Sequence, residues 1–469
     1  MRSLLLLPAL LAPSIALAAP AADTLRGRVE AKLAEAGPGV RFGLMVASMD
    51  GREILAIDPD GRFVPASNTK LFTTIAAFEL LPGLDQPDVE GGALVRLAPQ
   101  GSKQPIVILE GRGDARLSSA PDCRVNCLAT LADAVAARNR RVAGVVGAAP
   151  RYADERWSFG MSWNNIPTRS GTALAALTVD DNELALRVVP GAEGQPPQVQ
   201  VGDYVRVVNQ ALTVREGKTA LEVERLPGER TLRLTGTIAG NAGEQLLRLG
   251  IDDPAEFAAW RMTGMLRERG VRVGAGPVGR YLTEFRSTSS EIARVTPPPL
   301  AADIVTINKV SQNVHAELLL RRLGAARDKP SVAGGLEAVR IMLDRAGVPE
   351  RAATLADGSG MSPYNRVSPR GMVTMLRWAS GRPWGAALRA SLPVGGVDGT
   401  LARRFREGGL KGRIFAKTGS LNATSALSGY MLTAGGETLV FSIIANDVPE
   451  EVRATLIMDQ VLELVAASG

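Results

Sequence analysis

Hydrophobic and polar positions alternate near the start of the chain in a way that predicts a β-hairpin. The alternating segments 40–48 and 52–57 are joined through Asp50-Gly51. Asp-Gly between two such runs is a strong signal for a tight hairpin turn. A short helix is expected before this hairpin, over residues 24–36. Two early antiparallel strands are therefore predicted to open the fold.

Helical spacing dominates the segments that follow the hairpin and those near the chain end. Residues 68–81 are apolar nearly all round a helix, which is typical of a buried helix. Shorter helical patterns cover 316–323 and 332–346, and the last one covers 449–467. The polar face of the last helix is acidic, whereas a helix on a membrane surface carries Lys and Arg there. We therefore expect the terminal helix to pack on a sheet.

Three further strands are expected late in the chain, over 413–417, 426–433 and 439–446. Together with the early hairpin and the terminal helix, they predict one sheet assembled from both ends of the chain. The fold class is therefore α+β, an α/β sandwich in which helices flank an antiparallel sheet.

The hydrophobic pattern changes in the middle of the chain, where short strands, turns and isolated helices are predicted instead of long regular elements. We interpret residues 84–286 as an inserted, β-rich region of one or two accessory subdomains. The surrounding segments, 19–83 and 287–469, then form one discontinuous domain. The Ser-x-x-Lys, Ser-x-Asn and Lys-Thr-Gly motifs described below and all strands of the predicted sheet lie outside residues 84–286, so we expect removal of that region to leave the motif-bearing domain complete.

The first residues have the composition of a secretory signal peptide. Arg2 precedes an apolar run over 4–17, and the small-x-small triplet before residue 19 predicts cleavage after Ala18. This run is shorter than the roughly 20 residues that a helix needs to cross a bilayer, and no later stretch reaches that length. Residues 1–18 are therefore predicted to be removed on export to the periplasm, and a retained anchor is the alternative.

Composition narrows the classes of protein that fit. A chain of 469 residues with 45% hydrophobic and 22% charged residues is long enough for a sizeable folded core. Its formal net charge of +6 is small for that length, and no run of Lys and Arg is interleaved with aromatic residues. We therefore expect no nucleic-acid partner.

Histidine and cysteine are so rare that most common hydrolase sites are excluded. The only histidine is His315, so neither an H-E-x-x-H helix nor a three-histidine zinc site is possible. A Ser-His-Asp triad would also need a G-x-S-x-G elbow, which is missing from the sequence. We expect a Lys, Asp or Glu general base, no metal and no cofactor, and His315 is expected to pack or cap near Ser311.

The two cysteines, Cys123 and Cys127, lie four residues apart. Export favours their oxidation, because thiol pairs outside the cytoplasm tend to form disulfides. A small local disulfide is the favoured interpretation. Two buried free thiols are the alternative, since this spacing within a regular helix directs the Cβ atoms poorly.

Ser67-Asn68-Thr69-Lys70 stands at the start of the buried helix. Residues three apart share a helical face, which places the Ser67 hydroxyl beside the Lys70 amine. Burial and the positive end of the helix dipole both disfavour the ammonium form, so Lys70 is a candidate base toward Ser67. An N-capping serine with an exposed lysine would have the same spacing, but an all-apolar helix leaves Lys70 little surface to reach.

Two more motifs follow in the chain. Ser311-x-Asn313 precedes a helix, although Ser-x-Asn alone is weak evidence and also suits an N-cap. Lys417-Thr418-Gly419 ends a predicted strand and is followed by Ser420. Lysine supplies a fixed charge there, the hydroxyls donate hydrogen bonds, and glycine lets a substrate backbone approach closely.

The order Ser-x-x-Lys, Ser-x-Asn, Lys-Thr-Gly resembles the signature set of the penicillin-recognising serine enzymes. A separation of about 240 positions between the first two motifs is similar to that in the class C low-molecular-mass penicillin-binding proteins, the D-alanyl-D-alanine carboxypeptidase/endopeptidase family. Members of this family have extra domains inserted into a transpeptidase/β-lactamase-like domain. One departure is Gln312, where the family more often has Asp. Further strings that fit are 173–182, 357–362 with Asn365, and 396–401.

This resemblance implies a role for each motif residue. Ser67 would be the acylated nucleophile, Lys70 its base, and Ser311 the relay of a proton to the leaving amine. Backbone N–H groups of Ser67 and Ser420 would form the oxyanion hole. The implied substrate-binding residues are Asn313, Lys417, Thr418, Gly419 and Ser420.

Peptidoglycan peptides that end in D-Ala-D-Ala and β-lactam antibiotics are the partners that the resemblance implies. The expected activity is that of a serine D-Ala-D-Ala carboxypeptidase and DD-endopeptidase acting through an acyl-enzyme. A β-lactamase and a catalytically silent cell-wall binding protein are the alternatives. For the two lysines, we expect the pKa of Lys70 to be low and Lys417 to stay hydrated and charged at the mouth of the pocket.

Overall fold

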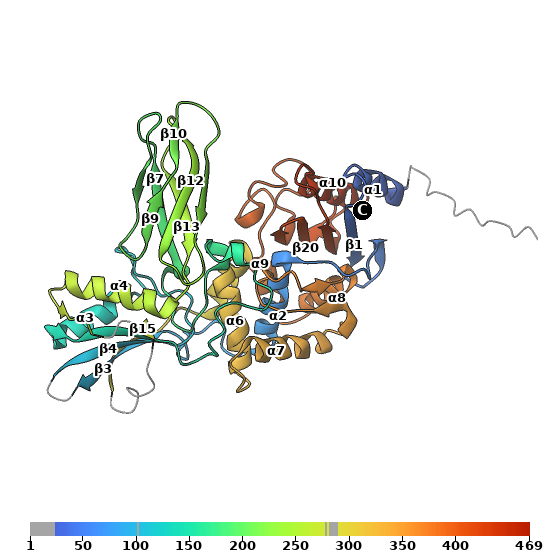
Figure 1. Cartoon of the computed structure of the whole chain (residues 1–469). Coiled ribbons are helices and arrows are strands. Elements are labelled where there is room, and N and C mark those ends of the chain that lie inside the picture. Colours follow the sequence, from blue (N-terminus) through green and yellow to red (C-terminus); the bar gives the residue numbers. More distant parts are fainter. Residues whose placement is uncertain (1–23, 101–102, 277–278, 281–288) are drawn as a thin grey trace, which may run out of the picture.

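The computed structural model describes residues 24–469 except 101–102, 277–278 and 281–288. The predicted signal peptide lies outside the described residues. Figure 1 shows a helix-rich lobe that contains both the early and the late elements, and a second region with a sheet, helices and an upright arm of strands.

The sheet of the helix-rich lobe combines strands from both ends of the chain. Its order is β19-β20-β21-β1-β2, and each neighbouring pair is antiparallel. Both the predicted hairpin and the predicted pairing of early with late strands are confirmed. The strands are β1 (Arg41–Ser48), β2 (Glu53–Ile57), β19 (Ile414–Leu421), β20 (Thr424–Leu432) and β21 (Thr438–Asn446).

Successive side chains along these strands point to opposite faces of the sheet and pack in two separate hydrophobic cores. Leu44 and Val46 of β1 pack with the helices on one face, whereas Met45 packs with those on the other face. This is the period of two expected of a strand that is covered on both sides. One face is covered by α1 (Leu25–Ala34) and α10 (Ala454–Ala467). The terminal helix therefore packs on the sheet, as predicted.

The opposite face of the sheet is covered by the helices that carry the motifs. Among them, α2 is buried through most of its length, in agreement with its apolar pattern. The helices on this side are α2 (Thr69–Leu80), α5 (Leu300–Lys309), α6 (Asn313–Ala325), α7 (Val332–Arg345), α8 (Pro369–Ser380) and α9 (Gly385–Ser391). Helices on both faces of an antiparallel sheet confirm the predicted α+β class.

The middle of the chain forms sheets of its own. A mixed sheet has the order β15-β6-β4-β3-β16 and packs against α3 (Leu128–Arg138) and α4 (Pro254–Glu268). Its strands are β3 (Ala93–Gln100), β4 (Lys103–Gly111), β6 (Gly144–Ala148), β15 (Gly279–Arg280) and β16 (Ser290–Val295). A short parallel pair of β5 (Arg141–Val142) and β14 (Arg272–Val273) lies beside it.

The upright arm in Figure 1 consists of two further small sheets around a shared core. One sheet has the order β13-β7-β8. In the other, β12 pairs with β9, β10 and β11. Their bounds are β7 (Glu183–Val189), β8 (Gln198–Gln200), β9 (Arg206–Asn209), β10 (Leu212–Val214), β11 (Ala220–Glu224), β12 (Thr231–Ala239) and β13 (Gln245–Gly250).

The expected domain limit at residue 286 falls short of the last strand of the inserted sheet. β16 begins at Ser290 and pairs antiparallel with β3, so the sheet of the inserted region extends to Val295. No strand described between 84 and 286 pairs with the sheet of the helix-rich lobe. We propose a division in which residues 84–295 form the inserted unit and the flanking segments form the catalytic unit.

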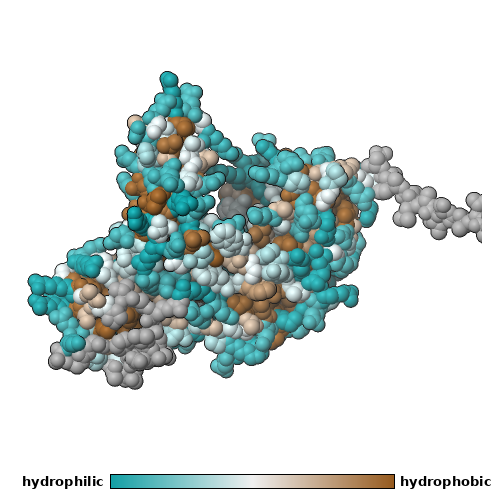
Figure 2. Space-filling model, viewed as in Figure 1, coloured by the Kyte–Doolittle hydropathy of each residue, from teal (hydrophilic) through white to brown (hydrophobic). Residues whose placement is uncertain are grey.

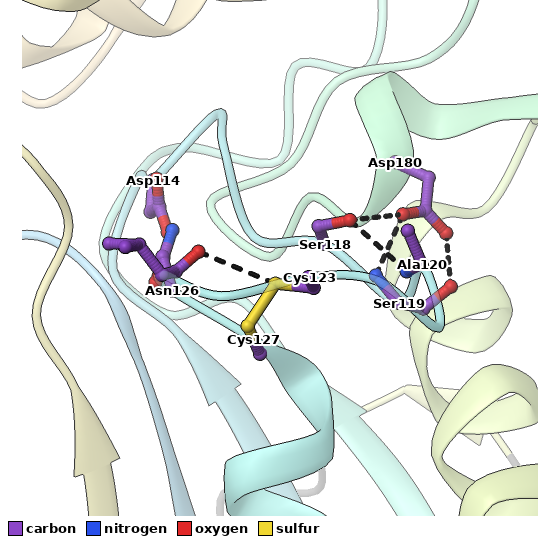
Figure 3. Close-up of a disulfide and its surroundings, with 9 residues drawn as sticks. Asp114, Ser118, Ser119, Ala120, Cys123, Asn126, Cys127 and Asp180 are labelled. Atoms are coloured by element: carbon purple, nitrogen blue, oxygen red, sulfur yellow. Dashed lines mark hydrogen bonds between the residues drawn. A yellow bond between two sulfur atoms is a disulfide. The ribbon is translucent and has the colours of Figure 1, made fainter.

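A disulfide joins Cys123 and Cys127 in the loop before α3 (Figure 3). Within this loop the Asn126 side chain donates to the buried Asp114 carboxylate. On the other side of the loop, the backbone N–H of Ser119 donates to Asp180 Oδ1 at 2.8 Å. The loop thereby supports the 3-10 turn that begins at Asp180 and includes Asp181.

Candidate active site

Ser67 and Lys70 meet at the start of α2, as their spacing predicts. Ser67 belongs to a short 3-10 turn (Ala66–Asn68) that leads directly into the helix. The Lys70 side chain is completely buried. Its Nζ lies 3.0 Å from Ser67 Oγ, 2.6 Å from Asn313 Oδ1 and 2.6 Å from the carbonyl oxygen of Ser359. Two of these three partners, the amide oxygen and the carbonyl, are acceptors only.

Two buried carboxylates lie behind Lys70. Glu317 of α6 accepts hydrogen bonds through Oε1 from the backbone N–H groups of Gly358, at 3.0 Å, and Ser359, at 2.9 Å. Asp357 accepts from the N–H of Gly360 at 2.8 Å. Glu317 therefore fixes the loop whose carbonyl at Ser359 binds Lys70.

Desolvation lowers the pKa of Lys70 to about 7, while the charges of Asp357 and Glu317 oppose that fall. Burial raises the pKa of Asp357 to about 6, and the Glu317 charge adds to this rise. A lysine with a pKa near neutrality exchanges its proton readily at physiological pH, which suits a general base.

Neighbouring segments pack closely on both sides of the turn that carries Ser67. A Cβ added to Gly360 would lie 1.9 Å from the carbonyl oxygen of Ala66, and its backbone has φ +89°. A Cβ on Gly419 would lie 2.6 Å from the carbonyl oxygen of Pro65. Glycine is required at these two positions because any larger residue would displace Ser67. Ala66 itself has a left-handed backbone with φ 48°, which is strained for alanine.

Lys417 lies on β19, which continues through the Lys-Thr-Gly motif to Leu421 instead of ending at it. Its Nζ donates to Ser311 Oγ at 2.9 Å and to the carbonyl oxygen of Thr418 at 2.9 Å. The expectation that Lys417 stays hydrated and charged is wrong, because its side chain is completely buried. Desolvation, with a smaller contribution from the Lys70 charge, holds the pKa of Lys417 well below its usual value.

A cavity of about 380 Å³ opens in front of these groups. Thr400 and Thr418 lie along it, and their hydroxyls are 2.7 Å apart. Metal-ligand clusters were not found among the residues that the structure describes. The motif residues Ser67, Ser311, Asn313, Thr418 and Ser420 line the cavity together with Arg169, Ser170, Gln312 and Met361.

The inserted region closes one side of this cavity. Arg169 and Ser170 belong to it, and Asn313 Nδ2 donates to the carbonyl oxygen of Ser170 at 2.9 Å. Ser158, also from the inserted region, donates to Glu317 Oε2 at 3.0 Å. Two contacts at the site therefore come from residues 84–286, although the sequence predicts that the motif-bearing domain is complete without them.

His315 does not line the cavity but lies buried behind Asn313. Nδ1 of its ring is 3.1 Å from Asp303 Oδ1 of α5, and Nε2 is 2.9 Å from Asp181 Oδ1 of the inserted region. Although burial alone would lower it, these two carboxylates raise the pKa of His315 to about 9. The packing role predicted for this histidine is confirmed, and the N-cap of α6 is Gln312.

Sequence reasoning missed the groups that support the motif residues from a distance. In the sequence, Glu317 is only one residue of a predicted helix, and Arg169 and Ser170 belong to no motif. Asp181, Asp357 and Thr400 lie in sequence segments that match the family. Their segments could be recognised from the sequence, but no role could be assigned to the three residues. Several of these residues reach the site only through contacts across more than a hundred positions of sequence, such as those from Asp181 to His315 and from Ser170 to Asn313.

Comparisons with known proteins agree with one another. The family model described as D-Ala-D-Ala carboxypeptidase 3 (S13) family matches residues 25–467. A D-alanyl-D-alanine carboxypeptidase of Actinomadura sp. (strain R39) is 33% identical over 429 residues, which cover 86% of this chain and 77% of that protein.

Among solved structures, penicillin binding protein 4 (dacB) of Haemophilus influenzae has a TM-score of 0.77 at 21% identity, covering 92% of this chain and 97% of that one. The same protein complexed with a β-lactam has a TM-score of 0.71 at 21% identity, covering 93% and 98%. These two likenesses support the fold. Of the helices in the described part of the chain, none is both long and apolar enough to cross a membrane.

Proposed function

The chain belongs to the D-Ala-D-Ala carboxypeptidase 3 (S13) family, and on that premise we propose how its residues divide the work of a serine D-Ala-D-Ala carboxypeptidase. The observation that carries the proposal is the set of contacts made by Lys70. Asn313 Oδ1 and the Ser359 carbonyl accept hydrogen bonds from two of its N–H groups. A neutral amine held in this way directs its lone pair toward the Ser67 hydroxyl, at 3.0 Å.

Acylation begins when Lys70 takes the proton of the Ser67 hydroxyl. Ser67 Oγ then forms a bond with the carbonyl carbon of the penultimate D-Ala, and the carbonyl π electrons move to its oxygen. Backbone N–H groups of Ser67 and Ser420 stabilise this oxyanion. As the tetrahedral species collapses, the C–N bond breaks and the proton reaches the leaving amine through Ser311.

A water molecule completes the cycle. Lys70, which is neutral again, removes a proton from the water, and the resulting hydroxide attacks the acyl-enzyme carbonyl. The ester bond to Ser67 breaks, and the hydroxyl is restored by the proton held on Lys70. The shortened peptide leaves with a new carboxylate.

The terminal carboxylate of the substrate is assigned to the other side of the cavity. Lys417 gains a proton when the carboxylate arrives and pairs with it, and the hydroxyls of Thr418 and Ser420 donate to the carboxylate. Gly419 keeps this strand close to the nucleophile turn, and Asn313 positions the substrate amide. The same arrangement would bind the carboxylate of a β-lactam. Cleavage of a crosslinked stem peptide at this site would be a DD-endopeptidase activity, carried out in the periplasm.

Intact-mass analysis with a penicillin tests the assignment of the nucleophile. Wild-type protein is expected to gain the mass of one penicillin at Ser67, whereas folded Ser67→Ala protein gains none. Release of D-Ala from a pentapeptide ending in D-Ala-D-Ala should be lost in the same variant. Full acylation of Ser67→Ala would overturn the assignment. Rapid turnover of penicillin without release of D-Ala would favour a β-lactamase, and neither reaction would favour a silent binding protein.

A further inference from the structure

A second cavity, of about 540 Å³, lies between the inserted arm and the loop that closes the active site. Its volume is within the range of about 300–1,000 Å³ that is usual for ligand sites. One wall comes from the loop, through Trp163, Asn164 and Pro167. The other comes from β9, β11 and β12 of the arm and includes Gln210 and Thr231. We name it the arm groove.

One short loop lines both the arm groove and the active-site cavity. Trp163, Asn164 and Pro167 face the groove, and Arg169 and Ser170 face the cavity with Ser67. The 3-10 turns at the two ends of this loop, Trp163–Asn165 and Arg169–Gly171, contact each other. Figure 2 shows a hollow between the arm and the helix-rich lobe. A long substrate attached at Ser67 therefore has a second concave surface one loop away.

Trp163 is the main apolar group of the groove and is 64% exposed. An indole of that size left in water at the edge of a cavity offers a flat, electron-rich face to a ligand. The faces of pyranose sugars carry C–H groups with a partial positive charge, and these groups stack on such a ring. The exposed side chains of Asn164, Gln210 and Thr231 add amide and hydroxyl groups that pair with sugar hydroxyl and N-acetyl groups.

Three of the four charged side chains that line the arm groove are paired within the protein. Arg225 is buried and lies 2.6 Å from Asp252 Oδ1. Arg233 and Glu224 form an ion pair at 3.4 Å. The fourth, Glu229, is exposed and acidic. Because both arginines already have acidic partners, the groove favours a neutral ligand over a phosphate or a carboxylate.

We propose that the arm groove binds the amino-sugar backbone of peptidoglycan, the glycan strand that carries the stem peptide being cleaved. This inference rests on the proposed function, because only a polymeric wall substrate places sugars next to a peptide held at Ser67. The groove then contributes binding energy to sugar-linked peptides and none to free peptides. Trp163 is the stacking residue of this site.

Kinetics with two matched substrates test the inference. One is a stem pentapeptide ending in D-Ala-D-Ala, and the other is the same peptide attached to its N-acetylated disaccharide. Trp163→Ala is expected to raise KM about tenfold for the sugar-linked substrate and to leave KM for the free peptide unchanged. Leu246→Ala is the control, since Leu246 is 44% exposed on the same arm but does not line the groove. It should change neither value.

A second variant tests the wall of the groove that lies opposite the loop. Gln210→Ala lies on the opposite wall and should raise KM for the sugar-linked substrate by about threefold, the effect of one lost hydrogen bond. Equal changes for both substrates in Trp163→Ala would mean that the loop disturbs the active site, and the inference would be overturned. Unchanged KM values for both variants would overturn it as well.

Direct binding separates failure of the groove from failure of the proposed function. A neutral oligosaccharide of N-acetylglucosamine, which has the amino-sugar backbone without peptide or lactyl carboxylate, is titrated into Ser67→Ala protein and into the Ser67→Ala, Trp163→Ala double variant, with calorimetry as the readout. Binding by the first and at least tenfold weaker binding by the second is expected. Absence of glycan binding would overturn the inference even if D-Ala is released normally. Glycan binding without D-Ala release would leave the groove supported and the proposed function refuted.

Discussion

Lys70 and Lys417 are buried to the same extent at one cavity, but their surroundings differ in charge. Behind Lys70 lie the carboxylates of Asp357 and Glu317, which oppose the effect of desolvation. Lys417 has only neutral oxygens as partners, those of Ser311 and Thr418. Its pKa is held well below the usual value by burial and by the Lys70 charge.

The difference teaches how two identical side chains acquire separate roles. Lys70, with a pKa of about 7, can hold or release a proton at neutral pH. Lys417 lacks a permanent counter-charge, so in the proposed mechanism a substrate carboxylate would become its counter-ion and raise its affinity for a proton. Under that proposal, the pKa of Lys70 is lowered before substrate binds, whereas Lys417 becomes charged on binding.

Replacing each lysine by arginine should give the largest difference between the two sites in the rate of penicillin acylation. Arginine stays charged but cannot act as a base, so Lys70→Arg should slow penicillin acylation about 1,000-fold at every pH. Lys417→Arg keeps a cation for the carboxylate and should retain a measurable rate. Stopped-flow acylation over pH 5–10 measures both, with circular dichroism to verify folding. Near-normal acylation by Lys70→Arg would contradict the assignment of Lys70 as the base.

Removing the charge behind Lys70 should have the next largest effect. Glu317→Gln leaves the buried Arg321 guanidinium, now 3.1 Å from Glu317 Oε2, without its ion-pair partner. The free energy of unfolding should fall by about 3–5 kcal/mol. The acidic limb of the acylation profile should move to lower pH, because the pKa of Lys70 falls when a nearby negative charge is lost.

Glu337→Gln is the matched control for this variant. Glu337 pairs with Lys329 on the surface, and both side chains are more than half exposed. Its loss should change the free energy of unfolding by less than about 0.5 kcal/mol and leave the pH profile unmoved. Equal destabilisation by the two variants would show that the buried carboxylate has no special role.

His315→Gln should alter how stability depends on pH. The pKa of His315 is raised from 6.5 to about 9 in the folded protein by Asp181 and Asp303. That stabilisation is complete below about pH 6.5 and is lost as pH rises through about 9, a change of about 3 kcal/mol at 1.4 kcal/mol per pKa unit. Urea unfolding at pH 6 and pH 9.5 measures it. The variant should lose this pH dependence, and an unchanged slope would contradict the imidazolium assignment.

Opening the disulfide should have the smallest effect. Replacement of both Cys123 and Cys127 by serine frees a very short loop, for which chain entropy predicts a loss of about 2 kcal/mol in the free energy of unfolding. Thermal unfolding of the double variant measures this loss. The acylation rate should change little, because the loop reaches the site indirectly, through Asp180 and through the ion pair of Arg116 with Asp303. A large loss of acylation without unfolding would place this loop in the site itself.

Local spacing predicted the parts of the site that lie on one element. Ser67 and Lys70 are one helical turn apart, so their contact follows from the period of the helix. The burial of Lys417 did not follow, because it depends on β19 continuing past the motif and on the loops packed over it. Glu317 looked like one residue of an amphipathic helix, and only the fold brings it to the loop behind Lys70. We place the proposed limit of the inserted region at Val295 for a similar reason, since the pairing of β16 with β3 spans about 200 positions.

The central sheet sets an order of events during synthesis. β1 and the nucleophile turn are made early, but β1 pairs with β21, which ends at Asn446. The ribosome releases that strand about 400 residues after β1, and during synthesis earlier segments fold first. Until then β1 lacks its neighbour, and the Lys-Thr-Gly strand has not joined the sheet. The proposed nucleophile, Ser67, therefore becomes competent only after the last strands of this sheet have been made.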